Sequence, residues 1–157
     1  GLSRWLGRER LDVTLASIAF AMNVIGVIGA AVVSGFVAPE VIMRLMFDSD
    51  EISRPALQQL LTYNGLLNQG FAKFHVMAES VAIAAWSAAL LGTGTGKGLG
   101  RLGWMISAAT AGALIFGALR LDVHGLAVVV LSHGVWFVWA GILLVKSHAR
   151  GPALAHA

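Results

Sequence analysis

The sequence has no cysteine and few charged residues. Without cysteine, the chain can form no disulfide bond, thiolate metal site or c-type haem attachment. Charged residues make up 12% of its 157 residues, and residues of the AVILMFWYC set make up 57%. Ordinary soluble domains contain roughly 25% charged residues. So few charges cannot cover a soluble surface, and the composition therefore favours an integral membrane protein.

Four long segments contain no Asp, Glu, Lys or Arg. A membrane-spanning helix needs about 20 mainly apolar residues, and the charge-free segments are 13–39, 80–96, 102–119 and 123–145. The second segment is long enough only if it begins near Gly70 and accepts Glu79 within the membrane. The segments lack the period-two alternation of barrel strands, and helices satisfy their own backbone hydrogen bonds in lipid. We therefore expect helices.

The sequence thus predicts an all-α integral membrane protein with a single domain, in which four transmembrane helices form an antiparallel bundle. The predicted helices cover about 12–38, 70–91, 102–119 and 123–145. Pro39 is expected to end the first of them. Small residues at Gly26, Ala30, Ala31 and Gly35, and at Ala109, Ala113 and Gly117, predict close helix packing. Trp86, Trp136 and Trp139 are expected to fill the bundle.

The connection 39–69 contains two apolar-periodic pieces separated by the acidic segment DSDEIS. The pieces are PEVIMRLMF and RPALQQLLTYNGLLNQ. They predict two short amphipathic helices at the membrane interface, with N-cap residue types ahead of Pro55. Such helices either cover the bundle as a lid or form a docking surface for a partner.

The glycine-rich run GTGTGKGLG, residues 92–100, does not form a phosphate-binding loop motif. That motif requires Ser or Thr after its lysine, whereas Gly98 follows Lys97 here. The run also joins two apolar helices instead of following a strand. It is therefore predicted to be a flexible turn.

Basic residues are distributed unevenly between the two sides of the predicted bundle. They outnumber acidic residues on the side that carries both termini and the turn at 92–100, whereas 39–69 is richer in acidic residues. The side rich in Lys and Arg faces the cytoplasm. We therefore expect a multi-pass protein of a bacterial inner (plasma) membrane, with both termini cytoplasmic and 39–69 extracytoplasmic. Nucleic acid is not an expected partner, because the basic residues are not interleaved with aromatics on one soluble face.

Polar side chains gather toward the extracytoplasmic half of the predicted helices 70–91 and 123–145. His75 and Glu79 are four residues apart and share a helix face. His133 matches Glu79 in depth and is its preferred partner, whereas His124 points the opposite way. We expect His124 to form a local hydrogen bond at the start of its helix, where Asp122 would be the N-cap.

Structural polar roles are expected for four further residues, namely Asn23, Asn68, Arg120 and Asp122. A carboxylate within the membrane is costly unless it is protonated, paired or hydrated. Glu79 and its neighbours therefore predict an outward-facing polar pocket.

Several interpretations of this pocket stay open. A hydrogen-bonded cluster of His75, Glu79 and His133 would fasten the helices together. The same three residues are candidate ligands of a divalent metal. His75 with either His124 or His133 is a candidate pair of haem ligands, which would suit a haem-, quinone- or metal-binding electron-transfer subunit. A small proton-linked transporter or sensor is the last alternative.

The leading hypothesis is a non-enzymatic polytopic membrane protein within a larger assembly. An enzyme is not expected, because no nucleophile elbow or other catalytic motif is present. A short bundle with few residues outside the membrane has little structure of its own that could carry an activity. We therefore expect the lipid bilayer and other membrane-protein subunits, or further copies of this chain, as its partners.

Overall fold

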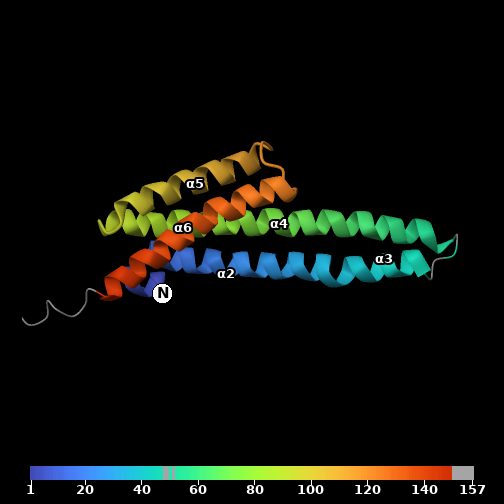
Figure 1. The fold of residues 1–157 in the computed structure, drawn as a ribbon, viewed down its shortest axis with the longest axis horizontal. Helices are drawn as coiled ribbons and strands as arrows, with labels where there is room; N and C mark the ends of the chain where they lie inside the picture. The colour runs from blue at the N-terminus through green and yellow to red at the C-terminus, as the bar shows by residue number, and fades with distance from the viewer. Residues whose placement is uncertain (48–49, 51, 150–157) are drawn as a thin grey trace, which may run out of the picture.

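The computed structural model describes residues 1–47, 50 and 52–149, and these residues form helices and turns without any strand. The elements are α1 (Leu2–Leu6), α2 (Leu11–Val32), the π-helical segment η1 (Val33–Val37), α3 (Ala38–Phe47), α4 (Ser53–Gly92), α5 (Lys97–Ile115) and α6 (Val123–Ala149) (Figure 1). Three helical stretches are long and apolar enough to cross a membrane: Leu11–Phe47, Ser53–Gly92 and His124–His148. The chain is therefore an all-α protein with the helices of a membrane protein.

The two short helices predicted within 39–69 are parts of longer helical stretches. α2, η1 and α3 form one helical stretch of 37 residues, and α4 is a single helix of 40 residues that includes the second piece. The predicted helices 12–38 and 70–91 were therefore too short. Residues 48, 49 and 51 of the acidic segment lie outside the described residues, and the carboxylate of Asp50 accepts a hydrogen bond from the Ser53 N–H at 2.7 Å.

Pro39 and Pro55 do not stop the helices, for different physical reasons. A proline ring inside a helix clashes with the carbonyl four residues earlier, and for Pro39 that residue is Gly35, within η1. A π segment widens the helix there and lets the chain pass the proline. Pro55 lies in the first turn of α4, where backbone N–H groups have no partner within the helix.

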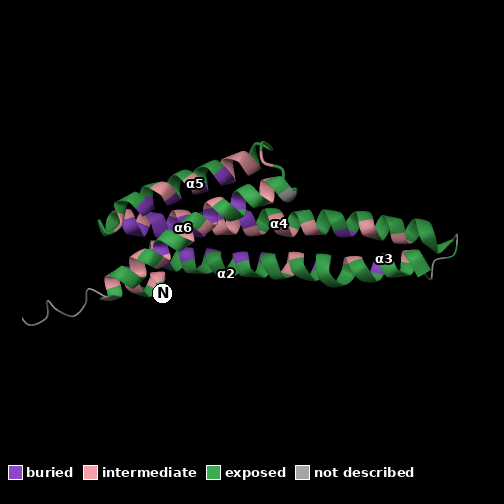
Figure 2. Cartoon of the chain, in the orientation of Figure 1, coloured by how far each residue is buried: buried purple, intermediate pink, exposed green. Residues whose placement is uncertain are grey.

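α2 and α3 lie alongside α4 and form a long hairpin (Figure 1). α5 and α6 lie beside only the C-terminal part of α4, so the far end of the hairpin projects beyond them (Figure 1). We call this projecting part, residues 33–47 and 53–68, the arm. The arm is largely exposed, whereas the buried residues concentrate where α2, α4, α5 and α6 meet (Figure 2).

Small residues allow α2 to approach α4 closely. The buried side of α2 consists of Val13, Ala16, Ala19, Asn23 and Gly26. A Cβ atom on Gly26 would lie 2.9 Å from the His75 Cβ and 3.1 Å from the His75 Cα. Gly26 therefore serves the packing role predicted for it, whereas Ala31 and Gly35 are exposed.

The face of α5 that packs against the bundle is not the predicted one. The helix predicted at 102–119 runs from Lys97 to Ile115, so Gly117 lies beyond its end. Ala109 is exposed and Ala113 is half-buried, whereas the buried residues of α5 are Leu99, Gly100, Gly103, Ser107 and Thr110. Both faces carry small residues, so residue size alone did not identify the packing face. The turn predicted at 92–100 is shorter in the structure, because α4 ends at Gly92 and α5 begins at Lys97. Within it, Gly94 and Gly96 adopt φ values of 74° and 71°, which favour glycine.

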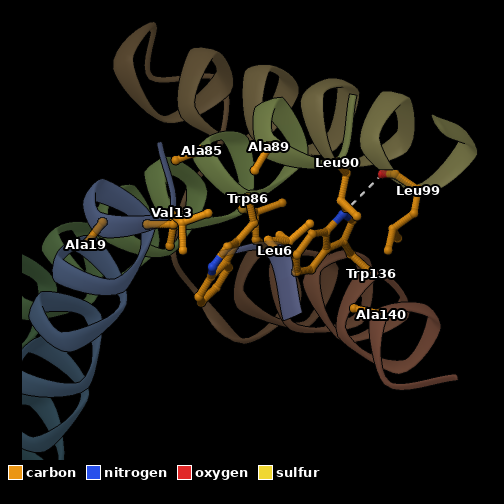
Figure 3. Close-up of a cluster of buried hydrophobic side chains, with 13 residues drawn as sticks. Leu6, Val13, Ala19, Ala85, Trp86, Ala89, Leu90, Leu99, Trp136 and Ala140 are labelled. Carbon is orange, nitrogen blue, oxygen red and sulfur yellow. Dashed lines mark hydrogen bonds between the residues drawn. The ribbon is translucent and has the colours of Figure 1, made fainter. Parts of the chain in front are cut away.

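Trp86 and Trp136 lie in the core at the end of the bundle near the N-terminus (Figure 3). Their rings stack with centroids 6.1 Å apart. The Trp136 Nε1–H donates to the Leu99 carbonyl at 3.2 Å, and the Trp86 Nε1–H donates to the Ser3 hydroxyl at 3.1 Å. Trp139 was wrongly predicted to fill the bundle, since it is 42% exposed.

We predict that Gly26→Ala destabilises the protein, because the added methyl group would meet the backbone of α4. Overpacking of this kind costs about 1–3 kcal/mol. Gly134→Ala on α6 is the matched control, since a Cβ there meets nothing within 4 Å. Unfolding in mixed detergent micelles should show the loss for Gly26→Ala alone. Equal stabilities of the two variants would contradict the close α2–α4 contact.

Candidate functional site

Glu79 and His133 form a hydrogen-bonded pair between α4 and α6. The His133 Nδ1 lies 2.9 Å from the Glu79 Oε2, and a carboxylate oxygen can only accept, so the Nδ1–H donates. Their side chains are 2% exposed for His133 and 15% exposed for Glu79. The structure thus brings together the two residues that the helix rise per residue placed at similar depth.

His75 faces α2, and its hydrogen-bond partner differs from that of Glu79. Its Nδ1 lies 2.8 Å from the Oδ1 of Asn23, which is buried on α2. His75 and Glu79 occupy neighbouring turns of α4, so α4 carries one polar contact toward α2 and the next toward α6. The predicted cluster of three is therefore two adjacent hydrogen-bonded pairs.

The second ring nitrogen of His133 is buried and has no hydrogen-bond partner among the described residues. Because Nδ1–H is directed at Glu79, neutral His133 presents its Nε2 lone pair to the interior. The hydroxyl groups of Ser80 on α4 and Ser107 on α5 are also buried without a partner among the described residues. The region where α4, α5 and α6 meet is therefore more polar than a lipid-facing helix pattern suggests.

A carboxylate that accepts the Nδ1–H of a histidine fixes the orientation of the ring. This arrangement also suits a histidine that binds a metal through Nε2. Within the part of the chain that the structure describes, however, no three His, Cys, Asp or Glu side chains come together as a metal site. The chemistry that the geometry offers is therefore the exchange of a proton within the pair, or a strong hydrogen bond that joins two helices.

The other predicted site residues lie away from this pair. His124 is exposed at the start of α6. Asp122 precedes α6, and its Oδ1 accepts the Gly125 N–H at 2.9 Å, which lowers the pKa of the Asp122 carboxyl group. Arg120 is exposed in the turn between α5 and α6, and Asn68 is half-buried on the arm.

Asn64 was missed by the sequence analysis, although it is 7% exposed on the arm. It precedes His75 by eleven residues, close to three helical turns, and therefore shares the face of α4 that carries His75. That spacing was available in the sequence. Asn64 was overlooked because 39–69 was assigned to short interfacial helices, in which its face could not be connected to that of His75.

We predict that the Glu79–His133 pair contributes a measurable coupling energy to stability. A double-mutant cycle with Glu79→Ala and His133→Ala should give about 0.5–3 kcal/mol, as expected for contacting residues. Removal of Glu79 alone leaves a buried imidazole N–H without its acceptor, which is costly. The measurement is unfolding in mixed detergent micelles.

The exposed pair formed by Glu40 and Arg44, with its N–O distance of 2.8 Å, provides the matched control. Exposed pairs of this kind contribute little, so the corresponding cycle should give a coupling energy near zero. A coupling for Glu79 and His133 no larger than this control would show that the buried hydrogen bond does not stabilise the fold.

Comparison with known proteins assigns the chain to no family. No family model, curated protein or solved structure matches it. Its function is therefore inferred from the arrangement of its own residues.

Proposed function

We propose that the protein is a non-enzymatic, polytopic membrane protein that works as a subunit of a larger membrane assembly and binds its partner through the arm. The observation that carries this proposal is the length of the hairpin. At about 1.5 Å per residue, helices of 37 and 40 residues are roughly 55 and 60 Å long. The hydrocarbon core of a bilayer is only about 30 Å thick.

The arm presents large apolar side chains beyond the part of the hairpin that a bilayer can cover. Met43, Met46 and Phe47 on α3 are 54%, 68% and 70% exposed, and Leu66 on α4 is 67% exposed. Contiguous exposed apolar surface outside lipid indicates an interaction site. Methionine adapts to irregular partner surfaces, so this surface suits an apolar helix of another subunit.

The two polar pairs support a fastening role within this subunit. The imidazole of His75 is directed to Asn23 on α2, and that of His133 is directed to Glu79 on α4. The two rings therefore have different hydrogen-bond partners. Each pair joins two helices, which would keep the hairpin and α6 together while the arm binds its partner.

We include α5 as a fourth membrane span of the proposed bundle. α4 ends at Gly92, beside Arg10 at the start of α2, whereas the residues just before α6 contact Gln69 on α4. The chain must therefore return along the length of the bundle between Gly92 and Val123. α5, with 19 residues, covers about 28 Å and supplies this return, although Lys97 and Arg101 lower its hydropathy.

The proposed orientation places both termini in the cytoplasm of a bacterial cell, with the protein in the inner membrane. Lys97 and Arg101 lie at the same end of the bundle as Arg4, Arg8 and Arg10, and the side richer in basic residues faces the cytoplasm. The arm is then extracytoplasmic, and its partner is expected to present a contact surface on that side.

The topology can be tested with single cysteines, because the natural chain has none. Thr95 and Ala118 are exposed in the turns before and after α5. A membrane-impermeant maleimide should label Ala118→Cys in intact cells and Thr95→Cys only after permeabilisation. Labelling of both cysteines from the same side would show that α5 does not cross the membrane. Labelling of Thr95→Cys in intact cells and of Ala118→Cys only after permeabilisation would support four spans in the reverse orientation.

Docking through the arm predicts position-specific crosslinking. Met46→Cys on the arm and Met105→Cys on α5 form a matched pair, since the native methionines are 68% and 69% exposed. A photoactivatable thiol reagent should give one discrete protein adduct in native membranes at position 46 and none at position 105.

The crosslinked complex must also depend on the apolar surface of the arm. In a chain that carries Phe47→Cys for crosslinking, Met43→Lys should abolish the adduct, whereas Met105→Lys should leave it unchanged. If the cysteine at position 46 gives no more adduct than the cysteine at position 105, or if Met43→Lys does not reduce the adduct, the arm is not the contact surface.

A further inference from the structure

A polar pocket lies at the far end of α5, between α4 and the turn that leads into α6. It has a volume of about 550 Å³, and its lining includes Gln69 and Lys73 from α4 together with Arg120 and Asp122 from the turn. None of these residues takes part in the two hydrogen-bonded pairs of the candidate site. We call it the outer pocket.

The turn that forms one wall of the outer pocket is held in place. The Gln69 side-chain amide donates to the Leu121 carbonyl at 3.2 Å. The Leu119 N–H donates to the Ala113 carbonyl at 2.9 Å. Leu121 is buried in a small cluster with Val76 and Val129. The pocket is therefore a formed feature, and its two cations project from anchored backbone.

The pocket lies at the depth of a membrane boundary. Lys73 precedes Gly92, the last residue of α4, by about 28 Å of helix. This distance matches the thickness of the hydrocarbon core, about 30 Å. Since Gly92 is close to Arg10 at one boundary, Lys73 and Arg120 lie near the opposite boundary, where phospholipid headgroups are found.

The charges of the pocket favour an anion. Lys73 and Arg120 are exposed, and neither has an ion pair within the described part of the chain. The carboxylate of Asp122 opposes them, but one of its oxygens is engaged by the Gly125 N–H. The net charge of these three side chains is a single positive charge. The guanidinium and ammonium groups are well suited to phosphate oxygens.

Apolar residues beside the pocket complete the pattern of a lipid site. Ile115 and Phe116, at the end of α5, are 67% and 87% exposed. Leu114 lines the pocket itself. A phosphate held by the two cations would leave its acyl chains free to lie along this apolar surface.

We propose that the outer pocket binds the phosphate headgroup of an anionic phospholipid. A free phosphate ion offers the same charge but no acyl chains for the neighbouring apolar surface. A choline headgroup would bring a third cation next to Lys73 and Arg120. An anionic lipid such as phosphatidylglycerol therefore suits the pocket better than either. The inference rests on α4 crossing the membrane and is independent of the arm and its partner.

Native mass spectrometry of the full chain in mild detergent tests the proposal, with titrations of phosphatidylglycerol, phosphatidylcholine and inorganic phosphate. The wild-type protein should bind phosphatidylglycerol more tightly than phosphatidylcholine, and excess inorganic phosphate should not displace it. Lys73→Gln with Arg120→Gln should weaken binding about 25-fold, because each basic residue near a lipid surface contributes roughly fivefold. Lys97→Gln with Arg101→Gln, at the other end of α5, is the control and should retain binding.

Several outcomes would overturn the proposal. Unchanged binding by the Lys73 and Arg120 double variant would exclude the pocket, and an equal loss in the control would show only general attraction to basic residues. Displacement by inorganic phosphate would identify a free-anion site. Equal affinity for the two lipids would exclude selection by charge. Circular dichroism and the thermal midpoint of both double variants should match the wild-type protein, and a variant that fails this check is replaced by Lys73→Arg with Arg120→Lys, which should retain lipid binding.

Discussion

The close contact between α2 and α4 is the constraint on which the other features depend. Gly26 lets the two backbones approach where His75 lies, and this approach brings Asn23 within 2.8 Å of the His75 ring. With its His75 face committed to α2, α4 directs Glu79 toward α6. α5 packs closely on α4 through small residues, whereas α6 reaches α4 through the longer side chains of His133 and Trp136. A larger residue at position 26 would therefore disturb both polar pairs as well as one helix contact.

The sequence predicted the helical fold because charged side chains are costly in lipid and are therefore absent from long segments of the chain. Each charge-free segment predicted a helix that the structure contains, although with different ends, and the rise of about 1.5 Å per residue matched Glu79 with His133 in depth. The prediction failed where the buried face of a helix depends on how the helices rotate against one another. Small residues on α5 could face either way, and only the packed structure shows that Gly103 is buried and Ala109 exposed.

Proline was the second source of error, because its effect depends on local backbone that a sequence pattern does not display. Pro39 was expected to end a helix, yet the π segment immediately before it accommodates the ring. The helix start expected just before Pro55 is present, since α4 begins at Ser53. The Pro39 error shortened the first predicted helix, and the assignment of the residues after Pro55 to a separate interfacial helix shortened the second. Together these errors concealed the arm, which is formed by the continuation of both helices.

Bilayer thickness connects the arm with the outer pocket. In the proposed arrangement, α4 places its C-terminal half in lipid, since Lys73 lies about 28 Å from its end and Glu79 is the one charged residue after Lys73 in this helix. Everything that precedes Lys73 on α4 then lies outside the hydrocarbon, and this includes Tyr63 and Leu66 of the arm. The same boundary brings Lys73 and Arg120 to the level of the headgroups. A single displacement of α4 along the membrane normal would bury these cations and cover part of the arm. The cost of burying two charges in lipid, several kcal/mol each, opposes that displacement, so the outer pocket helps to keep the arm exposed.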